Sequence, residues 1–282
     1  MKQISKFLGL ALIAFLTIGT LTLISCQKES FKQDSNSDNI SNGSNNNTSM
    51  QSGGFQILSD NEIDSIGIMH NELLDKILTE FDYNSLSPDN TFELARNSFI
   101  QTEYRNTTNE FKEITFDSTY LWIQQELISG NIEQYYLSIK VILESANSLS
   151  DASNNLGNLK IEVENNTDLT DFEKQTIKVG LSVAIHSAEY WFPIEMGGNG
   201  KGAAHLEKFS QYLGNNSGHL VVMSKGKSKA GKVAASDALG ACTGGIGFSL
   251  GAIFGGPVGV AAYAGALVYG AVSASLLSAA GV

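Results

Sequence analysis

The chain has 282 residues, a net charge of −11 and only two cysteines. Its acidity is concentrated in residues 60–192, which hold 23 Asp and Glu against eight Lys and Arg. A surface this acidic repels the phosphates of nucleic acids, so we expect no nucleic-acid partner.

Residues 1–25 have the layout of a secretory signal peptide. Lys2 and Lys6 precede an uncharged, mostly apolar stretch that ends at Ser25. A basic start, an apolar core and small residues before the cleavage point are typical of such signals. The alternatives are a plain transmembrane helix and a signal without lipidation.

Residues 23–26, Leu-Ile-Ser-Cys, resemble the lipobox of bacterial lipoproteins. The lipobox cysteine receives diacylglycerol on its thiol, so the resemblance implies lipidation at Cys26. Acyl chains on Cys26 would anchor the protein in a lipid bilayer. The following Gln-Lys-Glu-Ser is similar to the signal that sends some Gram-negative lipoproteins to the cell surface. We therefore expect a lipid-anchored protein of the outer membrane, exposed on the cell surface.

Residues 26–58 are expected to form a lipidated, disordered tether. Between positions 35 and 54 the chain is mostly Ser, Asn, Gly, Thr and Asp. Such a composition buries too little apolar area to offset the entropy of ordering the chain.

Residues 59–192 are predicted to form an acidic helical domain, because apolar residues recur there at the helical period. The pattern predicts helices from Ser59 or Asp60 to Phe81, over 91–104, 119–128 and 132–149, and from the capping box Thr170–Glu173 to Trp191. Pro193 ends the last of these. Residues 160–164 alternate as a strand does, but they are too few to change the class. The predicted fold class is all-α, a bundle of four to six helices.

Residues 193–237 are rich in Gly, Asn and Lys, and we predict a flexible linker there. Its lysines have three roles open to them. They can face anionic lipid headgroups, solvate the linker, or lie against the acidic bundle.

Residues 238–282 carry no charged side chain and are predicted to form a Gly/Ala-rich helical hairpin. Small residues four apart share a helix face and let another helix approach closely. The zipper-packing positions are Gly247, Gly251, Gly255, Gly259, Ala266, Gly270 and Ala274. We place the hairpin turn at Gly256 and Pro257. The two arms would be about 24 and 31 Å long as helices, against about 30 Å of bilayer core. Each arm inserts marginally alone, so a packed hairpin or an oligomer is favoured.

The sequence offers little catalytic or metal-binding chemistry. His70 lies near Glu72 and His186 near Glu189, but a metal site needs three or four converging ligands. No nucleophile elbow, phosphate loop or dinucleotide fingerprint occurs. We therefore expect no enzyme activity, no metal and no cofactor. Cys242 is interpreted as a small packing residue, with intermolecular pairing as the alternative.

The tail resembles glycine-zipper segments of outer-membrane lipoproteins and the Gly/Ala-rich tails of pore-forming class II bacteriocins. The whole layout is similar to that of Gram-negative lipoproteins with no assigned activity. The resemblance implies a surface lipoprotein with a membrane-active tail, as in an antibacterial effector, which acts on a membrane or self-associates through the zipper. The alternative is a structural or assembly lipoprotein whose zipper packs in its own core or in the outer membrane.

Overall fold

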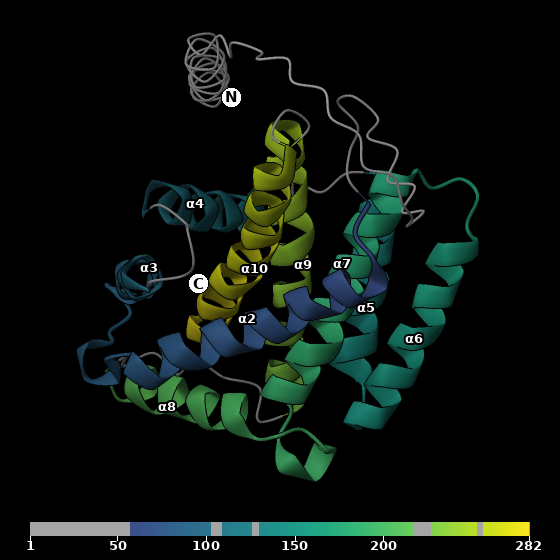
Figure 1. The fold of residues 1–282 in the computed structure, drawn as a ribbon. Helices are drawn as coiled ribbons and strands as arrows, with labels where there is room; N and C mark the ends of the chain where they lie inside the picture. The colour runs from purple at the N-terminus through teal and green to yellow at the C-terminus, as the bar shows by residue number, and fades with distance from the viewer. Residues whose placement is uncertain (1–56, 103–108, 126–129, 217–226, 253–255, 282) are drawn as a thin grey trace, which may run out of the picture. The chain divides into compact units, whose positions relative to one another are not determined.

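The computed structural model describes residues 57–102, 109–125, 130–216, 227–252 and 256–281 (Figure 1). These ranges form nine α-helices and two short 3-10 helices, with no strand among them, as the all-α prediction requires. The α-helices are α2 (Asp60–Glu80), α3 (Thr91–Gln101), α4 (Asn109–Gln125), α5 (Asn131–Ser145), α6 (Leu149–Asn165), α7 (Asp171–Trp191), α8 (Lys201–Asn216), α9 (Lys227–Ala252) and α10 (Gly256–Ala280). The 3-10 helices are η1 (Tyr83–Ser85) and η2 (Ile194–Met196).

Side-chain caps set the helix starts that the sequence predicted best. Ser59 and Glu62 form a capping box at the start of α2, and Thr170 and Glu173 form another at α7. In each box the hydroxyl accepts from a backbone amide of the first turn while the carboxylate accepts from the cap amide. Helix α7 ends at Trp191, and the extended Phe192 leads into Pro193.

The segment predicted as one helix over 132–149 is two helices in the structure. Helix α5 ends at Ser145, and Ser148 caps α6 by accepting from the amide of Asp151 at 3.1 Å. The strand-like alternation over 160–164 lies inside α6. Leu156, Leu159 and Val163 of that helix are buried at spacings of three and four, so the helical period decides the conformation.

Two other helices differ from their predicted bounds. Helix α3 ends at Gln101 rather than at 104, and α4 begins at Asn109, ten residues before the predicted start. The predicted end of α4, at 128, lies outside the described residues.

The predicted linker over 193–237 contains helix α8 and the first turns of α9. Leu206, Phe209 and Leu213 of α8 are buried at spacings of three and four. The apolar period therefore outweighs the Gly- and Lys-rich composition on which the linker prediction rested. Residues 51–282 form one compact unit, in which the predicted domain, linker and hairpin are parts.

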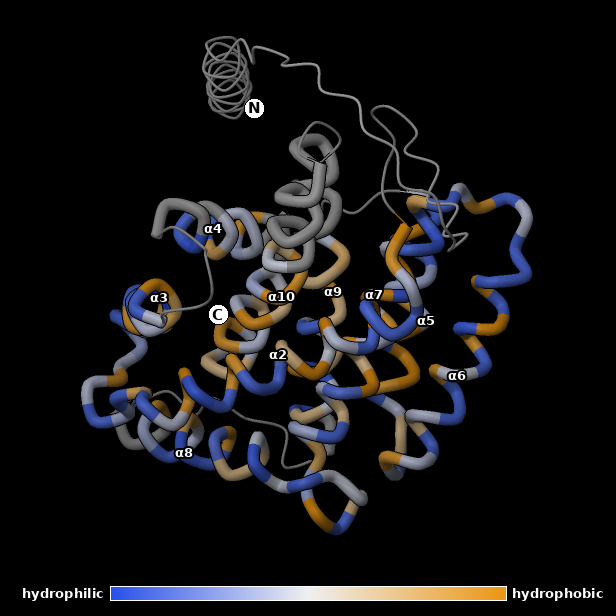
Figure 2. The backbone as a smooth tube through the Cα atoms, viewed as in Figure 1, coloured by the Kyte–Doolittle hydropathy of each residue, from blue (hydrophilic) through white to orange (hydrophobic). Residues whose placement is uncertain are grey.

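Helices α9 and α10 form the centre of this unit (Figure 1). Helix α9 packs against α7 and α5, while α10 packs mainly on α9 and also on α4, α2 and α3. Figure 2 shows hydrophilic residues alternating with hydrophobic ones along the surrounding helices α2, α6 and α8. The predicted apolar hairpin is thus the core around which the amphipathic helices pack.

Candidate functional site: the buried helical hairpin

Helix α10 is buried on all its sides over its second half. Every residue from Ala266 to Leu277 is buried, and so are Ala279 and Ala280. The helix carries no Asp, Glu, Lys, Arg or His. A helix that is apolar all round must be covered, either by protein or by lipid. Here protein covers it.

The two helices of the hairpin touch through their backbones. A Cβ atom added at Gly270 would lie 2.3 Å from the carbonyl oxygen of Gly240. One added at Gly240 would lie 2.2 Å from the oxygen of Gly270, and one at Gly244 would lie 2.5 Å from that of Ala266. Only glycine permits this separation, and small residues thus let the two helices approach closely in this part of the tail.

The predicted zipper positions divide into two groups. Ala266, Gly270 and Ala274 lie at the α9–α10 contact, opposite Gly240 and Gly244, which the sequence prediction missed. Gly247, Gly251 and Gly259 lie within the helices, but their surroundings are outside the described side chains. Gly255 is outside the described residues, as is Cys26, the predicted site of lipidation.

The sequence held a signal for the two missed glycines. Gly240, Gly244, Gly247 and Gly251 are separated by four, three and four residues, the spacing of one face of an α-helix. The interval of three between Gly244 and Gly247 interrupts the unbroken spacing of four on which the sequence prediction relied.

The predicted turn residues begin a helix instead. Gly256 and Pro257 are the first two residues of α10. Proline suits the first turn of a helix, because its missing N–H would have no intrahelical acceptor there and its fixed φ is already helical. Helix α9 extends to Ala252, and residues 253–255 between the two helices lie outside the described residues.

A buried polar cluster lies where the hairpin meets helices α2 and α7. Asp237 of α9 is fully buried and accepts a hydrogen bond from Trp191 Nε1 at 2.9 Å and a short one from the hydroxyl of Ser275. Ser187 is a further donor to this carboxyl group. His70 of α2, also fully buried, places its Nε2 3.0 Å from Ser275 Oγ and 3.6 Å from Asp237 Oδ2.

Burial shifts the two titratable groups of the cluster in opposite directions. Desolvation raises the pKa of Asp237 to about 7, although the hydrogen bonds from Ser275, Ser187 and Trp191 act the other way. Desolvation lowers the pKa of His70 to about 4, opposed by its bond with Asn71 and reinforced by the nearby His186. Each group is thus pushed toward its neutral form.

Helix α9 is also fitted closely to α7. Cys242 is buried, and a Cβ atom at Gly180 would lie 2.6 Å from its sulfur. Burial raises the pKa of the Cys242 thiol to about 12, so it stays protonated and unreactive in the folded protein. These contacts agree with a packing role for Cys242.

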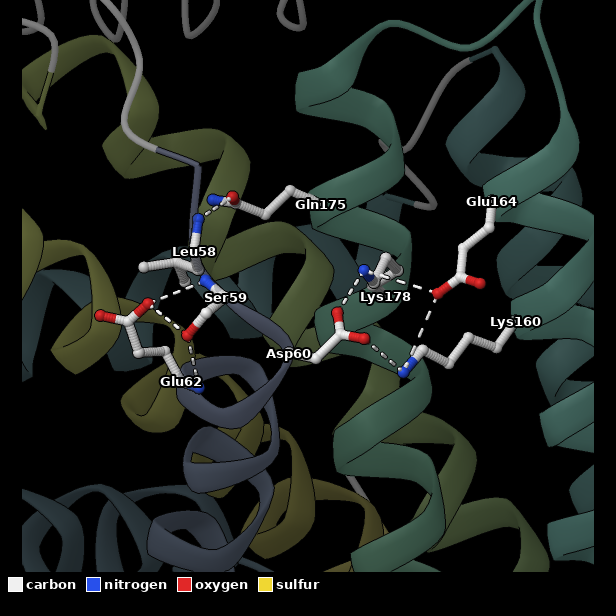
Figure 3. A network of polar contacts seen from close by, with 8 residues as sticks. All are labelled: Leu58, Ser59, Asp60, Glu62, Lys160, Glu164, Gln175 and Lys178. Carbon is white, nitrogen blue, oxygen red and sulfur yellow. Dashed lines mark hydrogen bonds and ion pairs between the residues drawn. The ribbon is translucent and has the colours of Figure 1, made fainter. Parts of the chain in front are cut away.

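Helix α2 covers part of the hairpin and is fastened at its first turn (Figure 3). The amide of Leu58 donates to Gln175 Oε1 at 2.6 Å, which ties the segment before α2 to α7. Asp60 pairs with Lys178 of α7 and, at 3.2 Å, with Lys160 of α6. The lysines hold the pKa of Asp60 below its usual value, Lys178 contributing most.

The other histidine of the sequence analysis takes part in the same contact between α2 and α7. His186 Nε2 lies 2.9 Å from Asp64 Oδ1, and its carbonyl oxygen accepts from Asn71 Nδ2 at 2.8 Å. Within the described ranges, no three His, Cys, Asp or Glu side chains converge as metal ligands would. Nor does any helix described here combine the length and apolar character needed to cross a membrane.

The described residues therefore form an all-α bundle built around an apolar hairpin, with a buried acid–histidine cluster where the hairpin meets α2 and α7. No protein-family model, curated protein or solved structure matches the chain.

Proposed function

We propose that the protein is a surface lipoprotein that stores a membrane-active helical hairpin inside an acidic helical shell, in the manner of a bacteriocin-like effector. The observation that supports this most directly is the burial of the second half of α10 on all sides. An uncharged helix of 25 residues is a poor surface element in water, and the shell shields it.

The way the hairpin is packed supports its movement as one unit. Helices α9 and α10 meet through backbone contacts at Gly240, Gly244 and Gly270, which involve these two helices alone. Packing between small residues also operates in lipid, where the hydrophobic effect between helices is absent. The α9–α10 contact can thus survive transfer from the shell to a bilayer, while contacts with the shell are exchanged for lipid.

A reversible lock on the hairpin tests this proposal. A Cβ atom at position 180 lies against the sulfur of Cys242, so Gly180→Cys should form a disulfide that ties α9 to α7. In the full-length chain with Cys26→Ser, Cys242 is otherwise the only thiol. We expect the oxidised variant to release no dye from liposomes, and reduction to restore release to the level of the Cys26→Ser chain.

A matched control carries Gly180→Cys together with Cys242→Ser, and its dye release should not respond to reductant. Liposomes of zwitterionic and of anionic lipid should both be used, since an acidic shell approaches anionic surfaces less readily. Absence of dye release from the reduced protein on every lipid composition would refute a membrane-active hairpin.

A second function is favoured by two specific observations. Gly240, Gly244 and Gly270 of the hairpin already pack against the other arm within the chain, and no described helix has the character of a membrane span. A structural or assembly lipoprotein would use the hairpin only as its core. In that case the locked and reduced proteins behave alike, and neither affects liposomes.

The lipid anchor at Cys26 and the outer-membrane surface location belong to the same proposal. They rest on the lipobox-like sequence before Cys26. Incorporation of labelled palmitate into the wild-type chain but not into Cys26→Ser, together with protease accessibility in intact cells, is the expected result. Palmitate labelling of Cys26→Ser would refute this assignment.

A further inference from the structure

The hydrogen-bond geometry of the cluster fixes where its protons lie. Asn71 Nδ2 donates to the carbonyl oxygen of His186 at 2.8 Å, so Asn71 Oδ1 is the atom facing His70 Nδ1 at 2.9 Å. An amide oxygen only accepts, and therefore Nδ1 of His70 carries a hydrogen. The charge of the imidazole then depends on whether Nε2 also carries one.

Ser275 lies between His70 Nε2 and the carboxyl group of Asp237. Its oxygen is 3.0 Å from Nε2 and forms the short hydrogen bond with Asp237 Oδ1. Two arrangements satisfy all three groups with one shared proton. Either Asp237 is protonated and donates to Ser275, which donates to Nε2, or Nε2 is protonated and donates to Ser275, which donates to the carboxylate. In both, the buried cluster has zero net charge.

We propose that His70, Ser275 and Asp237 share one proton, and that this sharing keeps the hairpin docked with an affinity that does not change between about pH 4.5 and 6.5. The proposal concerns regulation of the proposed hairpin release and rests on that function for its biological meaning. It implies that contact with a membrane or partner, rather than acidification, releases the hairpin.

Proton counting agrees with the geometry. In the unfolded chain the usual pKa values of 3.8 for Asp and 6.5 for His leave one proton on the two groups between those pH values. In the folded protein, with His70 at about 4 and Asp237 at about 7, the two groups also hold one proton over this window. Stability depends on pH only where the folded and unfolded states bind different numbers of protons.

The titratable groups around the cluster are few. His186 on α7 faces His70, and Tyr190 on α7 faces Asp237. Burial raises the pKa of Tyr190 further above its usual value, helped by Asp75 of α2 and Tyr83 of η1, so this phenol stays neutral throughout the window. Helix α10 contributes no charged residue. His186 is therefore the group to remove in a control.

Labelling of Cys242 measures hairpin opening in the absence of lipid. The full-length chain with Cys26→Ser is exposed to 4,4′-dithiodipyridine between pH 4.5 and 6.5. The rate at each pH is divided by that of the same chain unfolded in urea, which gives the opening constant. We expect this constant to change less than threefold across the window, with and without His186→Gln.

Single substitutions should uncover opposite pH dependences. In Asp237→Asn, His70 remains a buried base, and the opening constant should increase up to 100-fold as pH falls from 6.5 to 4.5. This follows because a difference of one bound proton between the open and closed states changes the constant tenfold per pH unit. In His70→Gln, Asp237 remains a buried acid, and opening should increase by a similar factor as pH rises. The double variant should again be flat.

The pH dependence of the opening constant in a chain that keeps His70 and Asp237 decides the proposal, whether or not the Asp237→Asn and His70→Gln variants fold. If this constant changes tenfold per pH unit in the His186→Gln chain, proton sharing is refuted. This readout contains no membrane, so it is independent of the dye-release assay. If the opening constant does not change with pH and no dye is released, proton sharing is supported and the membrane-active hairpin is refuted.

Discussion

The contact between α9 and α10 makes a quantitative prediction for glycine substitution. Gly270→Ala places a methyl group 2.3 Å from the carbonyl oxygen of Gly240. An ordinary contact needs about 3.5 Å, so the helices must separate by about 1 Å along this line. Overpacking of this kind costs about 1–3 kcal/mol, while alanine is a better helix former than glycine by about 0.8–1 kcal/mol.

We therefore expect Gly270→Ala to lower the free energy of unfolding by up to about 2 kcal/mol. Gly240→Ala should have a similar effect, since its methyl group meets the oxygen of Gly270 at 2.2 Å. Urea unfolding followed by circular dichroism at 222 nm, on the full-length chain with Cys26→Ser, measures both values.

Two other helical glycines serve as matched controls. A Cβ atom at Gly265 of α10 or at Gly157 of α6 has no neighbour within 4 Å. Alanine at either position should raise the free energy of unfolding by about 0.5–1 kcal/mol, because only the helix propensity changes. If Gly270→Ala stabilises the protein as much as Gly265→Ala does, then the backbone contact between the arms does not exist as described.

Two further substitutions test the buried cluster and the predicted cap. Trp191→Phe removes the Nε1 donor to Asp237 and should destabilise the protein by about 1–3 kcal/mol. The loss should be larger at pH 8 than at pH 5, because Asp237, whose pKa is raised to about 7, is fully ionised only above that pH. An equal loss at both pH values in urea titrations would contradict this. Thr170→Ala breaks the capping box of α7 and should cost about 1 kcal/mol at any pH from 6 to 8. Thr167→Ala is the comparison, because Thr167 is exposed and caps no helix.

The sequence predicted the elements whose signals are local. The capping box at Thr170 and Glu173 and the proline at 193 bound α7 correctly, since both act within one helical turn. Helix α8 was missed because Gly, Asn and Lys dominate its neighbourhood, although Leu206, Phe209 and Leu213 hold the helical period. There, tertiary burial outweighs local composition.

The candidate site was predictable only in part. The small residues Ala266, Gly270 and Ala274 were identified because their spacing is visible along one helix. The polar cluster was not, since Ser275 is 38 residues from Asp237 and 205 residues from His70, and no periodicity records such a pairing. The one local clue is Asp237, an isolated acid directly before 45 residues without charge.

The central position of α10 constrains the order in which the molecule can form. The helix comes after α2, α3, α4 and α9 in the sequence, and it packs against all four of them. During synthesis, the surrounding helices emerge while the element that fills their centre is still missing. Their apolar faces cannot be fully covered until α10 has also emerged, so the core is completed only after this helix is available.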